Sequence, residues 1–118
     1  MNLKKETIKA INESEHSKGS VVFVGSSESD YGISYEEFEK IADFEYDSGY
    51  GAQEVPYDLI ILFDDNSYLE RDEYDGSECW RLAGKINYKR VLIPFTQKGL
   101  RNGIWNTIAE LEEKEDID

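Results

Sequence analysis

The segment 58–80, which reads DLIILFDDNSYLERDEYDGSECW, constrains the fold of this chain more than any other part of it. It begins with an apolar run and continues through a polar turn at Asp64–Ser67 into a second β-rich run that ends at Tyr74. Asp75-Gly76 follows, and this dipeptide favours a tight type I′ turn, because both central positions of that turn need positive φ. The segment therefore predicts a three-stranded antiparallel meander whose third strand starts at Ser77.

The second predicted strand has two different faces, because successive side chains of a strand point to opposite sides of the sheet. One face is predicted to carry Tyr68, Glu70, Asp72 and Tyr74, and the other Leu69, Arg71 and Glu73. Neither face is plainly apolar. Part of this sheet is therefore expected to meet water or a partner.

The part of the chain before the meander predicts two helices and a strand. Apolar residues at helical spacing indicate a short amphipathic helix over 3–15, and the apolar run Val21–Val24 is typical of a buried strand. Ser34 and Glu37 form a capping-box pattern at the start of a helix predicted over about 35–47. Its outer side is expected to be strongly acidic.

The part of the chain after the meander predicts a fourth strand and a C-terminal helix. Val91–Phe95 is apolar, and Pro94 cannot donate a ladder hydrogen bond, so this strand is expected at a sheet edge. Apolar residues at helical spacing predict a helix from Leu100 or Gly103 to Glu113. The fold class is thus predicted as α+β, with an antiparallel meander of three to four strands packed against two to three helices.

The length and composition favour a single folded domain spanning residues 1–118. A hydrophobic content of 39% with 13% aromatic residues is too high for a disordered chain, even at a net charge of −13. One cysteine rules out an internal disulfide, and the sequence contains no apolar run as long as a signal sequence or a membrane span. We therefore expect a cytoplasmic protein without membrane contact.

The charge is distributed unevenly along the chain. From Glu28 to Glu78 there are 17 acidic residues and only two basic ones, Lys40 and Arg71, which gives a local net charge of −15. The segment 81–101 carries six basic residues and no acidic one. An acidic field of this kind repels nucleic acid and attracts basic surfaces, so direct nucleic-acid binding is not expected. Pairing against the acidic sheet is the favoured interpretation of segment 81–101.

The dense carboxylates of the middle segment suggest an ordered array that imitates the phosphates of duplex DNA. Such an array would bind the basic groove of a nucleic-acid-binding protein, although a merely solvated surface is the alternative. The residues predicted to bind the partner are Glu36, Glu37, Glu39, Asp43, Asp47, Asp64, Asp65, Glu70, Asp72, Glu73, Asp75 and Glu78.

Enzymatic chemistry has weaker support in the sequence. Asp64-Asp65-Asn66-Ser67 resembles the start of a calcium loop, but the sixth position is Leu69 and the twelfth is Asp75, where an EF-hand needs Gly and Glu. His16 and Cys79 have no spacing that indicates a nucleophile and its base. No cofactor, metal ligand or catalytic residue is therefore predicted, and a small carboxylate-based, metal-dependent hydrolase stays an alternative.

Two phrases of the sequence resemble a known motif pair. IADFEYDSGYGAQEV (Ile41–Val55) and YLERDEYDGSECW (Tyr68–Trp80) are similar to paired motifs in small, mostly uncharacterised proteins of phages and prophages. The second motif usually ends in a Trp-Trp pair, so Cys79 is a departure, and the resemblance covers only about residues 35–82. Small acidic phage proteins include anti-CRISPR proteins and DNA mimics, so the resemblance implies an inhibitor of host defence.

The sequence therefore leads to one main hypothesis and several alternatives. The main hypothesis is a non-enzymatic phage or mobile-element inhibitor whose acidic surface occupies the nucleic-acid-binding groove of a host defence nuclease. A CRISPR effector of the Cas9 kind is the preferred target. An immunity or antitoxin protein that neutralises a basic cognate toxin is the main alternative, and a structural phage protein is another.

Overall fold

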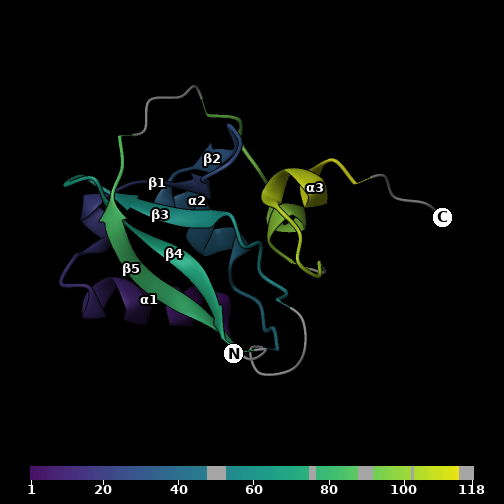
Figure 1. Ribbon diagram of the computed structural model, residues 1–118, viewed down its shortest axis with the longest axis horizontal. Coiled ribbons are helices and arrows are strands. Elements are labelled where there is room, and N and C mark those ends of the chain that lie inside the picture. Colours follow the sequence, from purple (N-terminus) through teal and green to yellow (C-terminus); the bar gives the residue numbers. More distant parts are fainter. Residues whose placement is uncertain (48–52, 75–76, 88–91, 102, 115–118) are drawn as a thin grey trace.

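Five antiparallel strands form one sheet in the computed structural model, which describes residues 1–47, 53–74, 77–87, 92–101 and 103–114 (Figure 1). The strands are β1 (Val21–Ser26), β2 (Gly32–Ile33), β3 (Leu59–Phe63), β4 (Ser67–Tyr74) and β5 (Ser77–Lys85), in the order β2-β1-β3-β4-β5. The predicted α+β class and the antiparallel meander, β3 to β5, are confirmed. The sheet has more strands than predicted, because β1 pairs with β3 and β2 pairs with β1.

Three α-helices are described: α1 (Leu3–Glu13), α2 (Tyr35–Ile41) and α3 (Ile108–Glu112). Short 3₁₀ helices, η1 (Lys18–Ser20) and η2 (Gln97–Leu100), precede β1 and α3. No described helix is long and apolar enough to cross a membrane.

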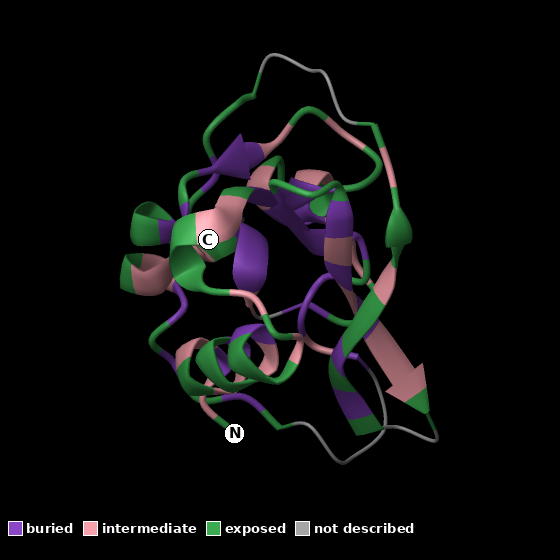
Figure 2. Cartoon of the chain, turned by 90° about the vertical axis from the view of Figure 1, so that its left-hand side faces the viewer, coloured by how far each residue is buried: buried purple, intermediate pink, exposed green. Residues whose placement is uncertain are grey.

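The main core lies between one face of the sheet, here called the helix face, and helices α1 and α2. Leu3 and Ile11 of α1 and Phe38 of α2 pack there with Ile61 and Leu69 of the sheet. The buried residues gather in this interior, whereas the helices expose much of their outer sides (Figure 2). Burial of this apolar surface is the main force that holds the helices on the sheet.

The opposite side of the sheet, here called the far face, carries a smaller apolar cluster. Phe23, Ile60 and Leu62 are buried there, and Tyr68 and Ile86 pack against them. The register pairs Leu69 with Leu82 and Arg71 with Trp80 on the helix face. It pairs Glu70 with Arg81 and Asp72 with Cys79 on the far face, as the alternation along β4 predicts.

Helix α2 is shorter than the helix predicted over 35–47. It ends at Ile41, and the chain beyond it pairs with the N-terminus: the backbone N–H of Leu3 donates to the Phe44 carbonyl at 3.1 Å, and the N–H of Tyr46 donates to the Met1 carbonyl at 2.9 Å. Phe44 and Tyr46 are buried in this extended segment. Phe44 and Tyr46 are therefore buried by an extended segment, although the sequence pattern predicted a helix there.

The C-terminal part of the chain also differs from the prediction. The helix predicted from Leu100 or Gly103 begins only at Ile108, where Thr107 accepts a hydrogen bond from the Glu110 N–H and forms a capping box with it. Trp105 before it has a positive φ of 58°, which is incompatible with a right-handed helix. The strand predicted over 91–95 is described only from residue 92 and forms a single parallel bridge between Ile93 and Tyr31.

Buried Asp58 ties helix α3 to the sheet. Its carboxylate accepts hydrogen bonds from the Ser26 hydroxyl at the end of β1 and from the Ile108 N–H at 2.9 Å. Burial raises the pKa of Asp58, although these hydrogen bonds act in the opposite direction. The first turn of α3 is thus anchored at the end of the sheet where β1 ends and β3 begins.

Candidate partner-binding surfaces

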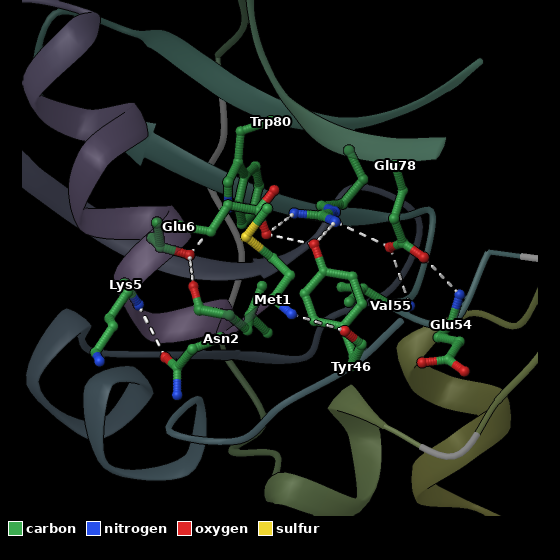
Figure 3. Close-up of polar contacts among 12 residues, drawn as sticks. Met1, Asn2, Lys5, Glu6, Tyr46, Glu54, Val55, Glu78 and Trp80 are labelled. Atoms are coloured by element: carbon green, nitrogen blue, oxygen red, sulfur yellow. Dashed lines mark hydrogen bonds and ion pairs between the residues drawn. The ribbon is translucent and has the colours of Figure 1, made fainter. Parts of the chain in front are cut away.

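Arg71 is the centre of a buried polar cluster between the sheet and α1, and neighbouring residues of that cluster appear in Figure 3. Its side chain has no exposed area, and its guanidinium contacts Glu6 at 3.2 Å, Glu78 at 2.9 Å and the Tyr46 hydroxyl at 2.9 Å. The rings of Tyr46 and Trp80 lie 5.6 Å and 4.9 Å from it. Burial alone would lower the pKa of Arg71, but its acidic partners raise it overall.

Glu78 belongs to this cluster, which corrects its prediction as a surface residue. It is 3% exposed, and besides Arg71 it accepts hydrogen bonds from the backbone N–H groups of Glu54 at 2.8 Å and Val55 at 3.2 Å (Figure 3). A buried carboxylate needs such partners to offset its lost hydration. Glu78 therefore faces the interior, where it positions the chain around Val55.

Glu70 and Asp72 lie on the far face and meet a basic residue of the same sheet. Arg81 forms an ion pair with Glu70 and lies 3.9 Å from Asp72. For Arg81 the predicted internal pairing of the basic segment is thus seen, whereas Lys89 and Arg90 lie outside the described residues. This pairing lowers the net negative charge that the far face can offer a partner.

Asp64 and Asp65 lie at the turn between β3 and β4, where Asp65 makes a local polar cluster. Its carboxylate accepts hydrogen bonds from the Ser67 N–H at 3.0 Å and the Ser67 hydroxyl, and it contacts His16 Nε2 at 3.0 Å. These hydrogen bonds hold the pKa of Asp65 well below its usual range. Asp64 is exposed at the same turn.

Helix α2 presents the clearest exposed acidic groups. Ser34 caps it, since the Ser34 hydroxyl accepts a hydrogen bond from the Glu37 N–H at 3.2 Å, and Phe38 anchors the helix in the core. Glu36 and Glu37 are exposed, and neither forms an ion pair among the described residues. Glu39 is half-buried.

The remaining predicted residues are spread over three places. Asp43 and Asp47 are exposed in the extended segment after α2, and Asp43 accepts a hydrogen bond from the Asn2 side chain at 3.0 Å. Glu73 is partly buried and pairs in register with Glu78, and Asp75 lies outside the described residues. The twelve predicted residues therefore do not form one surface, because α2 covers the helix face while Glu70 and Asp72 project from the far face.

A second acidic group escaped the sequence analysis. Glu28 from the β1–β2 loop and Glu110 of α3 both lie near Tyr57: burial raises the pKa of Tyr57, and the charges of these two residues raise it further. Glu28 and Glu110 are both exposed. They are 82 positions apart, so no pattern in the sequence could have indicated that they are close.

The groups considered for catalysis or metal binding are placed as follows in the described part of the chain. In this part of the chain, no group of three or more His, Cys, Asp or Glu side chains is placed to hold a metal ion. The ring nitrogens of His16 contact Ser14, Asp65 and Ser67. The pKa of the Cys79 thiol is raised, mainly by burial and then by the charge of Asp72. A raised pKa disfavours the thiolate that a nucleophilic cysteine needs.

Fold and surface together define an acidic α+β protein with a five-stranded antiparallel sheet and helices on one face. Its exposed carboxylates include those on α2 and the segment after it. Comparison of the chain with protein families, curated proteins and solved structures finds no match.

Proposed function

We propose that this protein is a non-enzymatic inhibitor, encoded by a phage or mobile element, that binds a basic nucleic-acid-binding protein. A host defence nuclease of the Cas9-like CRISPR effector kind is the proposed target. The observation that carries the proposal is the exposure of Glu36 and Glu37 on α2 and of Asp43 in the segment after it. These three residues are here called the α2 acidic surface. Neither Glu36 nor Glu37 is neutralised by an ion pair among the described residues.

A helix cap and two buried side chains fix the position of α2, which carries Glu36 and Glu37. The Ser34 cap and the buried side chains of Tyr35 and Phe38 hold α2 in place, so little backbone conformational entropy is lost when its carboxylates meet a partner. Ordered carboxylates can replace phosphates in a basic groove, because the partner's Lys and Arg side chains donate charge-assisted hydrogen bonds to either anion. Relative to the sequence hypothesis, the proposed contact surface is narrower and excludes Glu78.

The test is DNA cleavage by a purified Cas9-like effector loaded with guide RNA, with the inhibitor titrated in. We expect inhibition at about 50 mM salt that weakens on the order of tenfold or more at about 200 mM, because the interaction is electrostatic. The triple variant Glu36→Lys, Glu37→Lys, Asp43→Lys should abolish inhibition. Circular dichroism and thermal unfolding should show that this variant keeps its fold.

A matched control carries the same charge change elsewhere. The triple variant Glu15→Lys, Glu28→Lys, Glu113→Lys alters three exposed acids, and each triple variant raises the formal net charge from −13 to −7. The control should still inhibit. Equal loss of inhibition in both variants would show that only total charge matters, and no inhibition by the wild-type protein would remove this class of target.

A further inference from the structure

Two segments that lie side by side near α3 expose three large apolar side chains. Tyr57, Ile104 and Trp105 have exposed fractions of 42%, 65% and 48%. Backbone hydrogen bonds join the two segments: the Trp105 N–H donates to the Gln53 carbonyl at 2.9 Å, and the Tyr57 N–H donates to the Asn106 carbonyl at 3.3 Å. Large apolar side chains that gather on an exposed surface are typical of an interaction site.

The loop that carries Trp105 is held in an unfavourable backbone conformation. Trp105 has a φ of 58°, in the left-handed region that bulky side chains rarely adopt. The Asn106 side-chain oxygen accepts a hydrogen bond from the Ile104 N–H at 2.8 Å, and a Cβ at Gly103 would lie only 2.8 Å from the same oxygen. These contacts fix the loop, so a partner that binds Trp105 has little backbone entropy to remove.

Two carboxylates without an ion pair lie close to Tyr57. Burial raises the pKa of the Tyr57 hydroxyl, and the charges of Glu28 and then Glu110 raise it further. Both acids are exposed, and neither forms an ion pair within the described part of the chain. The Glu110 carboxylate accepts the Thr107 N–H at 3.2 Å in the capping box of α3, but no described cation compensates its charge. This apolar region therefore favours a cationic partner.

We propose that this region binds an arginine-bearing segment of a partner protein. Its residues, here called the Trp105 surface, are Glu28, Tyr57, Ile104, Trp105 and Glu110. A guanidinium can stack on an aromatic ring and also donate hydrogen bonds to a carboxylate, whereas the ammonium of lysine is more strongly hydrated and lacks the planar shape. Apolar neighbours of the arginine would cover Ile104. A second copy of this chain is a poorer occupant, because it would bring the same carboxylates.

The Trp105 surface is separate from the α2 acidic surface and does not depend on the proposed function. The probe is the peptide acetyl-Arg-Leu-Arg-Leu-Arg-amide, titrated into the ¹⁵N-labelled full-length protein. The chain has two tryptophans, and the indole N–H signal of Trp105 should shift. The signal of Trp80 should stay in place, because this side chain is buried and its indole N–H donates to the Thr7 hydroxyl at 2.9 Å.

Two further peptides test the chemistry of the ligand. Replacing the arginines by lysine should weaken binding about threefold, because stacking and paired hydrogen bonds are lost while the charge is kept. Replacing them by glutamate should weaken binding at least about tenfold, because like charges then meet.

Protein variants localise the binding. The double variant Glu28→Gln, Glu110→Gln keeps a capping side chain on α3 and should weaken binding of the arginine peptide about tenfold. The control Glu36→Gln, Glu37→Gln makes the same charge change on α2 and should leave the Trp105 shift and the affinity unchanged. Trp105→Ala should also weaken binding about tenfold, with the fold checked by circular dichroism. An unchanged Trp105 signal, equal binding of the lysine peptide, or equal loss in the two glutamine variants would each overturn the proposal.

Discussion

At the scale of single residues, Arg71 joins the acidic groups that are buried between the sheet and α1. One guanidinium holds Glu6 and Glu78 inside a protein of net charge −13, and the Tyr46 hydroxyl and the Trp80 ring complete its surroundings. A buried ion pair is only weak evidence of net stabilisation, because desolvation offsets much of the attraction. Removing one partner is costly, since it leaves the other charges buried without compensation.

Arg71→Met should therefore lower the free energy of unfolding by about 3–5 kcal/mol, as measured by urea denaturation at neutral pH. The matched control is Arg81→Met, because Arg81 pairs with Glu70 but is largely exposed, and its loss should cost less than about 1 kcal/mol. Adding Glu6→Gln and Glu78→Gln to Arg71→Met should recover part of the lost stability. Equal effects of the two arginine substitutions would contradict the role assigned to Arg71.

At the scale of elements, the β3–β4 turn is joined to the α1–β1 linker by His16. The imidazole stacks on Phe63 with ring centroids 3.8 Å apart, and its Nε2 contacts Asp65 at 3.0 Å. Nδ1 lies 2.9 Å from the Ser14 carbonyl oxygen, so both ring nitrogens face oxygen atoms. This arrangement connects two loops that are distant in sequence at one end of the sheet.

The pKa of Asp65 makes this connection sensitive to pH. Its folded-state pKa lies below the value of about 4 expected in the unfolded chain, so the unfolded state binds more protons in that window. The contribution of Asp65 to the free energy of unfolding should be complete above about pH 5 and fade as the pH falls below about 4. Asp65→Asn should have a lower free energy of unfolding than the wild-type protein at pH 6, and urea denaturation should show that this difference shrinks as the pH falls to 2.5.

The neighbouring variant Asp64→Asn controls for the loss of one negative charge at the same turn. Its side chain makes no hydrogen bond within the described part of the chain, so its stability should follow that of the wild-type protein more closely at each pH. If the free energy of unfolding of Asp65→Asn stayed below that of the wild-type protein by the same amount at every pH, the charge of Asp65 would contribute nothing to stability.

At the scale of the whole molecule, the net charge of −13 opposes folding and favours the proposed binding. Self-repulsion between exposed carboxylates destabilises the compact state, whereas the same carboxylates attract a basic partner. Salt screens both effects. The buried ion pairs of Arg71 are less affected, because screening acts mainly on exposed charges.

Raising the salt concentration from about 10 to 150 mM, where the Debye length falls from about 30 to 8 Å, should therefore raise the thermal unfolding midpoint. Differential scanning calorimetry would measure this rise. The triple lysine variant of the α2 acidic surface, at a net charge of −7, should show a smaller rise. A midpoint that falls with salt would indicate that exposed ion pairs outweigh self-repulsion.

Sequence patterns were sufficient for the elements whose signals lie within a few residues. The meander follows from the apolar run of β3, the alternation along β4 and the turn residues between them, and the Ser34 cap marks the start of α2. Such patterns report local backbone preferences and the side-chain periods of strands and helices. They could not show where α2 ends, because backbone pairing of residues 44–46 with the N-terminus decides that.

The tertiary structure alone decided which charges meet. Arg71 and Glu6 are 65 positions apart, and Glu28 and Glu110 come together at Tyr57 only because Asp58 anchors α3 on the sheet. The acidic middle of the chain was evident from composition, but its division between α2, the far face and the interior depends on strand order and packing. Charge along a chain is a local property, whereas an ion pair or a surface is set by contacts between residues distant in sequence.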